Sequence, residues 1–397
     1  MDGPIAVVNA GSSTVKFSLL NGEKPALGAL LDRLGSGAGN GACATLRDAG
    51  AGTLFQGPIP AENHEDALVW LFDWLARNNG EFKPAAVGHR VVHGGDSLIR
   101  PERVTDEVIG RIEALVPLAP LHQPHNLAPI RLLAAKFPDL PQVACFDTAF
   151  HATQSAVERR FALPREYEAA GIRRYGFHGL SYEYIASRLP ETDPLAAEGR
   201  TIVCHLGNGA SLCAMRAGRS VATTMSFTAL DGIPMGTRCG AIDPGVLLHL
   251  MGQPGMDART LSDLLYKRSG LLGLSGLSGD MRDLLASDRP EAAEAVEYFC
   301  YRIAREIGSL SAVLGGLDAL VFTAGIGEHA APVRDRICQL SAWLGVVIDP
   351  AADRILHTPD SAVHVLVVPT DEEAMIARHV RQTLGLAQGA QGSPKSP

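Results

Sequence analysis

The chain has 397 residues, 46% of them hydrophobic, and a formal net charge of −8 at pH 7. This length predicts about two domains, and the acidic balance excludes a broad nucleic-acid-binding surface, so a bound anion needs a local group of Arg and Lys side chains. The seven cysteines form no CxxC pair, which indicates reduced thiols in the cytoplasm. Because Asp2-Gly3-Pro4 replaces a basic leader and no apolar run is long enough to span a bilayer, we expect neither a signal peptide nor a membrane segment.

The first predicted element is a strand–turn–strand unit over residues 5–20. Two apolar runs flank a turn of small residues at positions 10–14. Gly and Ser let backbone N–H groups approach an anion closely, and Lys16 adds a positive charge. The spacing GxxxxGK[ST] is absent, so this is not a Walker loop. Taken alone, the pattern fits a plain glycine hairpin as well as a polyphosphate site with a metal ion at Asn9.

Capping residues and apolar periodicity predict further elements up to residue 150. Asn63 and Thr105 are expected to cap two helices, and Pro129 is expected to begin a third helix near Leu132. Two buried strands are predicted at residues 85–92 and 143–146, and residues 35–52, rich in Gly and Ala, are predicted to form a loop with one short strand.

After Phe150 the pattern begins again. Residues 201–215 repeat the strand, Gly-rich turn and strand of the opening stretch, which predicts a duplicated fold. Helices are predicted at residues 258–267, 280–286, 291–314, 332–344 and 371–384, and strands at residues 319–323 and 363–368. We expect the last helix to return to the first domain. The predicted domains are therefore residues 1–150 plus 371–386 and residues 151–370, with a disordered tail at 387–397.

Three Gly-rich turns each follow a predicted apolar strand, at residues 9–16, 205–211 and 325–329. Their order resembles the two phosphate hairpins and the adenosine turn of the actin, Hsp70 and sugar-kinase superfamily. Two hairpins can hold a triphosphate through backbone N–H groups, and a turn at a helix start can lie against the nucleoside.

Four further segments are more specific than this scaffold. They are GHRVVHGG at residues 88–95, FDTAFH at 146–151, RYGFHG at 174–179 and MGTRCGAIDP at 235–244. These segments, in this order over residues 5–378, resemble the acetate kinase (acetokinase) family. The resemblance implies an α/β fold with two similar actin-like (ribonuclease H-like) domains. Each would have a mixed sheet flanked by helices, with the nucleotide in the interdomain cleft. It also implies a homodimer and reversible transfer of a phosphoryl group from ATP to acetate, giving acetyl phosphate and ADP.

The residue types in these segments suit that chemistry. A carboxylate attacking the γ-phosphoryl group of ATP passes through a loose transition state whose oxygens need hydrogen-bond donors. Arg90 and Arg238 offer two-pronged donors, and His178 and His122 each offer one hydrogen bond. A carboxylate needs no general base at neutral pH. We therefore interpret Asp147 as a residue that orients an Arg or metal-bound water, although the family role is often described as acid/base.

The resemblance also implies the metal and nucleotide contacts. Asn9 and Glu372 would anchor Mg²⁺, with Mn²⁺ as the alternative, partly through water. The ATP contacts would be Asn9, Ser12, Thr14, Lys16, His205, Leu206, Gly207, Asn208, Gly209, Asp280, Met281, Arg282, Gly325, Ile326, Gly327, Glu328 and His329.

The acetate methyl group sits in an apolar pocket in this family, and the matching positions are Val92, Leu121, Phe177 and Ala229. Ala229 stands where the family usually has proline, so one more methylene could be accommodated, worth about 0.8 kcal/mol of burial. A propionate kinase, or a broader short-chain carboxylate kinase, is therefore an alternative. A butyrate kinase would need a larger pocket than Ala229 alone provides.

The sequence also admits two less favoured interpretations. An actin- or Hsp70-like ATPase is the alternative from a different class, but it would leave the Arg and His residues of the specific segments without a purpose. His89 and His93 have the spacing of a helical metal site, but they flank a predicted strand, so they cannot share a helical face.

Overall fold

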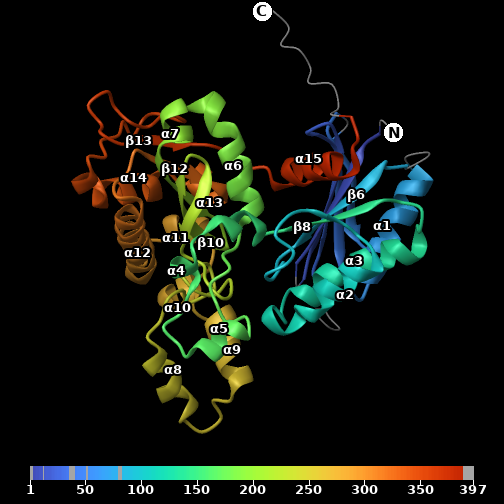
Figure 1. Ribbon diagram of the computed structural model, residues 1–397, viewed down its shortest axis with the longest axis horizontal. Helices are drawn as coiled ribbons and strands as arrows, with labels where there is room; N and C mark the ends of the chain where they lie inside the picture. Colours follow the sequence, from blue (N-terminus) through green and yellow to red (C-terminus); the bar gives the residue numbers. More distant parts are fainter. Residues whose placement is uncertain (1–2, 12, 35–40, 51, 79–82, 388–397) are drawn as a thin grey trace, which may run out of the picture. The chain divides into compact units, whose positions relative to one another are not determined.

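The computed structural model describes residues 3–11, 13–34, 41–50, 52–78 and 83–387. Ser12 and the predicted tail from residue 388 onward lie outside these residues. Contacts within the chain divide it into two compact units (Figure 1). Unit 1 comprises Met1–Ala149 and Asp371–Pro397, and unit 2 comprises Phe150–Thr370.

Unit 1 is built on an eight-stranded mixed sheet with the order β5-β4-β3-β2-β1-β6-β8-β7. Its strands are β1 (Ile5–Ala10), β2 (Val15–Asn21), β3 (Lys24–Asp32), β4 (Cys43–Asp48), β5 (Gly52–Pro58), β6 (Ala86–Val91), β7 (Glu102–Arg103) and β8 (Gln142–Phe146). Neighbours from β5 to β1 are antiparallel, whereas β1, β6 and β8 run parallel. The predicted opening hairpin is thus confirmed.

Helices cover both faces of this sheet. They are α1 (His64–Asn78), α2 (Asp106–Ala114), α3 (Gln123–Lys136) and α15 (Glu372–Leu384), with a 3₁₀ turn η1 (Val116–Leu118). Helix α1 begins where it was predicted, because the side chain of Asn63 accepts a hydrogen bond from the N–H of Asp66 at 2.9 Å. Its apolar side buries Leu68 and Leu71 in one core with Phe17. Helix α15 packs against β1, β6 and β8, so the C-terminal helix belongs to unit 1.

The prediction that Pro129 begins a helix near Leu132 is wrong. Helix α3 begins at Gln123, and Pro129 lies inside it. Pro124 occupies the first turn, where the missing proline N–H costs nothing because it would have no partner inside the helix. The sequence carries both prolines, and the earlier one marks the helix start.

Unit 2 is built on a five-stranded mixed sheet with the order β11-β10-β9-β12-β13. Its strands are β9 (Arg200–Leu206), β10 (Ala210–Arg216), β11 (Arg219–Thr223), β12 (Ala319–Thr323) and β13 (His364–Val367). Strands β11, β10 and β9 are antiparallel, and β9, β12 and β13 are parallel. The sequence β3-β2-β1-β6-β8 of unit 1 has the same pattern. The predicted duplication is therefore visible in the topology.

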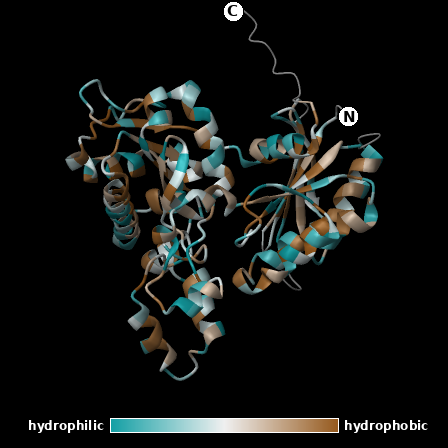
Figure 2. Cartoon of the chain, viewed as in Figure 1, coloured by the Kyte–Doolittle hydropathy of each residue, from teal (hydrophilic) through white to brown (hydrophobic). Residues whose placement is uncertain are grey.

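Unit 2 has helices on both faces of its sheet and further helices that lie away from it (Figure 1). They are α4 (Ala156–Arg159), α5 (Arg165–Ala169), α6 (Gly179–Thr192), α7 (Pro194–Glu198), α8 (Pro244–Met251), α9 (Ala258–Lys267), α10 (Gly270–Ser275), α11 (Met281–Leu285), α12 (Pro290–Leu314), α13 (Ala324–His329) and α14 (Ala331–Leu340), with 3₁₀ turns η2 (Ala149–Thr153) and η3 (Ala342–Leu344). The long helix α12 packs on β9, β10 and β11, whereas residues of α6 and α7 share a core with the opposite face. The flanking helices carry both hydrophobic and hydrophilic residues (Figure 2), as expected for helices with one buried face.

The third Gly-rich segment was predicted to be a turn, but residues 324–329 form the short helix α13. Ala324 has a positive φ of 64°, so the chain turns sharply between β12 and the helix. The side chain of Glu328 stabilises this turn by accepting a hydrogen bond from the N–H of Ala324 at 2.9 Å. The predicted helix over residues 332–344 is split into α14 and η3.

Within the residues that the structure describes, no helix combines the length and the apolar character needed to cross a membrane.

Candidate active site

The parallel strands of unit 1 bring three predicted site residues to one edge of the sheet. Asn9 lies near the end of β1, Arg90 lies near the end of β6, and Asp147 follows β8. The carboxyl ends of neighbouring parallel strands meet at the same edge, so these side chains come together although they are far apart in the sequence.

Arg90 is the centre of this group. Its guanidinium forms an ion pair with Asp147, in which Nη2 contacts Oδ2 closely and Nε donates to Oδ1 at 3.2 Å. Its Nη1 donates to Oδ1 of Asn9 at 3.3 Å, and its Nε lies 3.7 Å from Oε2 of Glu372 at the start of α15. The structure therefore brings three other predicted residues of unit 1 around the positive charge of Arg90.

Burial sets the ionisation of this group. Burial is the largest cause of a raised pKa of Asp147; the positive charge of Arg90 opposes the shift and Glu372 adds to it, and together they leave this pKa at about 6. Burial also lowers the pKa of Arg90, but the two carboxylates outweigh it and leave that pKa above its ordinary value. Near neutral pH, Arg90 is thus charged and Asp147 is mostly ionised.

Two residues that the sequence analysis missed position this group. Asn126 of α3 accepts a hydrogen bond from the N–H of Val92 and donates to the carbonyl of Ala10, both at 2.9 Å. His64, the first residue of α1, donates through Nε2 to the carbonyl of Gly11 at 2.6 Å. Neither residue lies in a recognisable motif, because each acts by contacting backbone groups that are distant in the sequence.

The remaining predicted residues of unit 1 lie near these contacts along the chain. Lys16 is exposed on β2, and Thr14 accepts a hydrogen bond from the N–H of Gly11 at 2.8 Å through its carbonyl. His122 directly precedes α3. Val92 is buried, whereas Leu121 is 42% exposed.

In unit 2, His178 and His205 form a stacked pair. Their ring centroids lie 4.2 Å apart with an angle of 21° between the planes. Nδ1 of His178 is hydrogen-bonded to Oγ of Ser211 at 2.9 Å, and Ser211 is bonded to the buried hydroxyl of Tyr182 at 2.5 Å. His178 has a positive φ of 58°, which turns the chain into α6. The hydrogen bond to Ser211 fixes the orientation of the ring, and Nε2 lies toward the β9–β10 turn at Gly209.

Arg238 lies beside the same hairpin. Its Nη1 donates to the carbonyl of Ala229 at 2.8 Å, which anchors the guanidinium. A Cβ atom placed on Gly209 would lie 3.4 Å from Nε2 of His178 and 3.6 Å from Nη2 of Arg238. The backbone of the β9–β10 turn therefore approaches both side chains, and glycine leaves that space open.

Beside this turn is a pocket of about 580 Å³. Its predicted lining residues are Gly207, Asn208, Asp280, Met281, Arg282, Gly325, Ile326 and His329, and its other lining residues are Gly279, Leu285, Ala330 and Pro332. The sequence analysis missed the latter four, and only their closeness in sequence to the predicted segments could have indicated them. Asp280 caps α11 and pairs with Arg282, whose hydrogen bonds lower the pKa of Asp280 to about 2.

Other predicted residues of unit 2 have structural contacts. The carboxylate of Glu328 accepts hydrogen bonds from the N–H groups of Ala324 and Thr370, at 2.9 and 3.2 Å. Gly327 of α13 lies against β9, where a Cβ atom on it would be in ordinary van der Waals contact with the Cys204 carbonyl at 3.5 Å. Leu206 ends β9 and is buried, and so is Phe177.

The group around Arg90 and the group beside the pocket of unit 2 suit different ligands. Around Arg90, the amide oxygen of Asn9 and the carboxylates of Asp147 and Glu372 are the oxygen ligands that a hard divalent cation prefers. Beside the pocket of unit 2, the glycine backbone, His178 and Arg238 provide hydrogen-bond donors for an anion.

Comparisons with known proteins point to one group of enzymes. The sequence model of the acetokinase family matches residues 4–378. An acetate kinase of Rhodopseudomonas palustris is 53% identical over 390 residues, covering 96% of this chain and 98% of the relative. A crystal structure of acetate kinase from Porphyromonas gingivalis has a TM-score of 0.87 at 35% identity, covering 96% of this chain and 100% of that one. A propionate kinase structure from Francisella tularensis has a TM-score of 0.90 at 35% identity, with 97% and 100% covered.

Proposed function

The chain belongs to the acetokinase family and acts as a phosphotransferase on a carboxyl group, and we propose that it transfers the γ-phosphoryl group of ATP reversibly to acetate, giving acetyl phosphate and ADP. The observation that carries this proposal is the position of His178 and Arg238. Both border the backbone of Gly209, directly after Gly207 and Asn208, which line the pocket. Donors thus stand at the phosphate end of a nucleotide-sized cavity.

ATP is proposed to occupy the pocket of unit 2. The apolar side chains of Met281, Leu285 and Ile326 suit the flat faces of the nucleoside. The glycine-rich β9–β10 turn suits the phosphates, because backbone N–H groups can approach them without a side chain between. Because hydrogen-bond donors lie at the β9–β10 turn, we expect the γ-phosphoryl group to lie beside His178 and Arg238.

Transfer is proposed to proceed in line and without a covalent enzyme intermediate. Arg238 and Nε2 of His178 stabilise charge on the phosphoryl oxygens, and Arg90 offers its guanidinium to the negatively charged acceptor. Asp147 holds the plane of Arg90 through two contacts rather than moving a proton, because acetate is already ionised at neutral pH. His122 is proposed as a further donor.

Mg²⁺ is proposed as the metal, with Mn²⁺ as the alternative. The oxygens of Asn9 and Glu372 would hold it, and both side chains already contact Arg90. When bound, the ion supplies positive charge that neutralises phosphate oxygens. Lys16 on the exposed side of β2 is proposed to contact the phosphates as well.

Propionate is a second candidate acceptor. Ala229 is small, and its carbonyl is already engaged by Arg238, so its methyl group is the part left to border the acceptor. We propose that Ala229 and the buried Phe177 contribute to the surface that meets the acceptor's alkyl group. A relative with a similar fold is a propionate kinase.

A homodimer in the cytoplasm is the proposed state of the protein. On α8, Val246, Leu248 and Met251 are 41%, 72% and 53% exposed, an apolar surface suited to a second copy of the chain. All seven cysteines are free thiols, which fits a reducing compartment.

Formation of acyl hydroxamate tests the function. The purified protein is incubated with ATP, Mg²⁺, hydroxylamine and one of acetate, propionate or butyrate. We expect kcat/KM to be highest for acetate, a measurable rate with propionate, and a much lower rate with butyrate. ATP turnover that does not depend on a carboxylate would refute a kinase of this class and favour an ATPase.

A further inference from the structure

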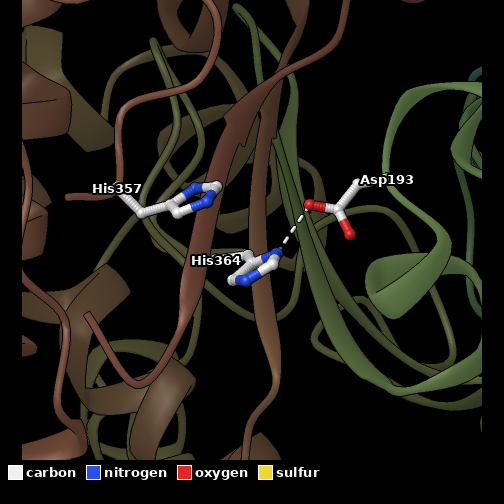
Figure 3. A group of neighbouring side chains, drawn as sticks. All are labelled: Asp193, His357 and His364. Carbon is white, nitrogen blue, oxygen red and sulfur yellow. Dashed lines mark hydrogen bonds and ion pairs between the residues drawn. The ribbon is translucent and has the colours of Figure 1, made fainter. Parts of the chain in front are cut away.

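Three side chains from separate segments of unit 2 meet at the amino end of strand β13 (Figure 3). Asp193 caps α7, His364 begins β13, and His357 lies in the segment before this strand. One potential ligand atom of each residue lies within 4.8 Å of the others. None of these residues belongs to the phosphoryl-transfer groups described above.

The existing contacts place the three groups for a shared ligand. Nδ1 of His364 is hydrogen-bonded to Oδ2 of Asp193 at 2.7 Å. The rings of His357 and His364 are nearly parallel, with centroids 4.1 Å apart. Nδ1 of His357 lies 3.1 Å from the backbone nitrogen of Val365 and 3.3 Å from its carbonyl oxygen. Backbone contact of one ring nitrogen, with the other directed to an ion, is common in metal-binding histidines.

The charge of the group favours a cation. Burial alone would raise the pKa of Asp193, but hydrogen bonds from the N–H of Ala196 and from His364 outweigh it and leave this pKa below its ordinary value. The carboxylate is therefore ionised at neutral pH, and each imidazole beside it carries a nitrogen that can bind a metal ion.

The distances require only small side-chain movements. Two ligands bound to one tetrahedral zinc ion lie about 3.3 Å apart, given metal–ligand bonds of about 2.0–2.1 Å. The pair of His364 and Asp193 must open slightly from 2.7 Å, and His357 must turn toward them. The side chain of His364 is 32% exposed and that of Asp193 is 10% exposed, so solvent reaches the group.

We propose that Asp193, His357 and His364 form a binding site for a transition-metal ion of the zinc class. Two nitrogens and one carboxylate suit Zn²⁺, Co²⁺, Ni²⁺ and Cu²⁺, whereas Mg²⁺ and Ca²⁺ prefer oxygen ligands alone. Water completes the coordination. These ligands include two histidine nitrogens, whereas the group around Arg90 offers oxygen ligands only.

The position of the site indicates a structural role. His364 pairs with Ala319 at the amino ends of β13 and β12. The nucleotide pocket is lined by Gly207 and Gly325, which follow the carboxyl ends of β9 and β12. A bound ion would join α7, the segment containing His357 and the edge strand β13. It should therefore stabilise unit 2 without taking part in phosphoryl transfer.

The test uses the full chain freed of metal with a chelator. Zn²⁺ is titrated against a chromophoric competitor in excess Mg²⁺, which occupies sites built from oxygen ligands. We expect one competed Zn²⁺ per chain and a rise in Tm of roughly 5 °C at saturation. The variants His357→Gln and His364→Gln should each weaken binding by at least about 10-fold. His249→Gln, which changes an exposed histidine on α8, is the matched control and should bind as the unaltered chain does.

Co²⁺ provides a second readout that does not depend on stability. The intense visible absorption of tetrahedral Co²⁺ is expected in the unaltered chain and in His249→Gln, and it should be lost in the two other variants. The proposal is overturned if no Zn²⁺ is retained, or if retention and the Tm rise persist when His357 and His364 are both replaced. Equal loss in His249→Gln would likewise overturn it.

Discussion

Arg238 illustrates how much of this site depends on single side chains that are held in place by the backbone. Its guanidinium is tied to the carbonyl of Ala229 and borders Gly209, so its direction is set before any ligand binds. Preorganised donors stabilise developing charge without reorganisation during the reaction, which makes them worth more than mobile ones.

Replacing Arg238 should therefore impair the chemical step. We expect Arg238→Ala to lower kcat at least ~100-fold, because the donors to the phosphoryl oxygens are lost. The circular dichroism spectrum and the Tm should change little. Arg289→Ala, which removes an exposed arginine next to α12, is the control and should keep full activity. Unimpaired turnover in Arg238→Ala would refute the assignment of this residue.

Asp147 should give the reaction a distinct pH dependence. Because its pKa is raised to about 6, the carboxylate is ionised above that pH and becomes protonated below it. Protonation removes the charge that holds Arg90, so kcat/KM for acetate should fall as the pH drops through about 6. The control is Asp147→Asn, which keeps the shape of the side chain. It should lower the plateau and remove this acid limb. An identical acid limb in the variant would assign the titration to another group.

At the scale of elements, the packing of α15 on β6 brings Glu372 close to Arg90. Gly88 and Arg90 project from the same face of β6, since side chains alternate along a strand. A Cβ atom on Gly88 would lie 2.3 Å from Cγ2 of Ile376 and 2.8 Å from Cγ2 of Val380. Only glycine lets the helix lie this close, and the first residue of that helix is Glu372.

Gly88→Ala should push α15 away from the sheet. We expect a loss of about 2 kcal/mol in the free energy of unfolding, in the range typical of overpacking. Shifting Glu372 should also weaken Mg²⁺ binding, which would be seen as a higher Mg²⁺ concentration for half-maximal activity. Denaturant unfolding and Mg²⁺ titration measure these two effects.

The companion variant Gly88→Ala/Ile376→Ala decides the cause. Removing the Ile376 side chain opens the space that the new methyl group needs, so its cost should be much less than the sum of the two single changes. Simple additivity would show that steric contact with α15 is not the reason for the loss.

At the scale of the whole molecule, both units contain buried histidines that are neutral at pH 7. Burial lowers the pKa of His89 and His93 in unit 1 and of His151 in unit 2, each to about 4. His89 is hydrogen-bonded to Gln142 at 2.7 Å, and His151 to Ser220 at 2.8 Å. The alternative of a metal site at His89 and His93 was not favoured from the sequence, and His89 instead completes the packing of β6 against β8.

These histidines should make the protein sensitive to acid. A histidine with a pKa of 6.5 when unfolded and about 4 when folded takes up a proton on unfolding between these values. The stability is thus complete above about pH 6.5 and is lost as the pH falls toward 4. Each of these buried histidines should lower the free energy of unfolding by about 2 kcal/mol between pH 8 and pH 5.

Urea unfolding at several pH values tests this expectation. His89→Gln should reduce the loss of unfolding free energy between pH 8 and pH 5 by about 2 kcal/mol, because one proton uptake is removed. The exposed variant His249→Gln is the control and should follow the unaltered chain. An unchanged pH dependence in His89→Gln would show that this residue is not responsible.

Local patterns carried much of the fold. Helix α1 follows its cap at Asn63, and β9 and β10 form the second predicted hairpin, because caps and alternating apolar residues act over a few neighbours. Strands β3 and β5 escaped prediction, because β3 also carries a hydrophobic residue, Leu30, at an exposed position and β5 has no buried residue. The start of α3 was misplaced because two prolines competed for the same role.

The sequence by itself determined the family and the residue types that the chemistry needs, because motifs such as those around Arg90 and His178 are short and contiguous. Only the tertiary structure decided which groups meet. Asn126 is hydrogen-bonded to two backbone groups distant in sequence, Glu328 accepts a hydrogen bond from the N–H of Thr370, and Asp193 is hydrogen-bonded to His364, which lies 171 positions away. These contacts depend on strand order and helix packing, and no local pattern encodes them, since the partners come together only when the sheets have formed.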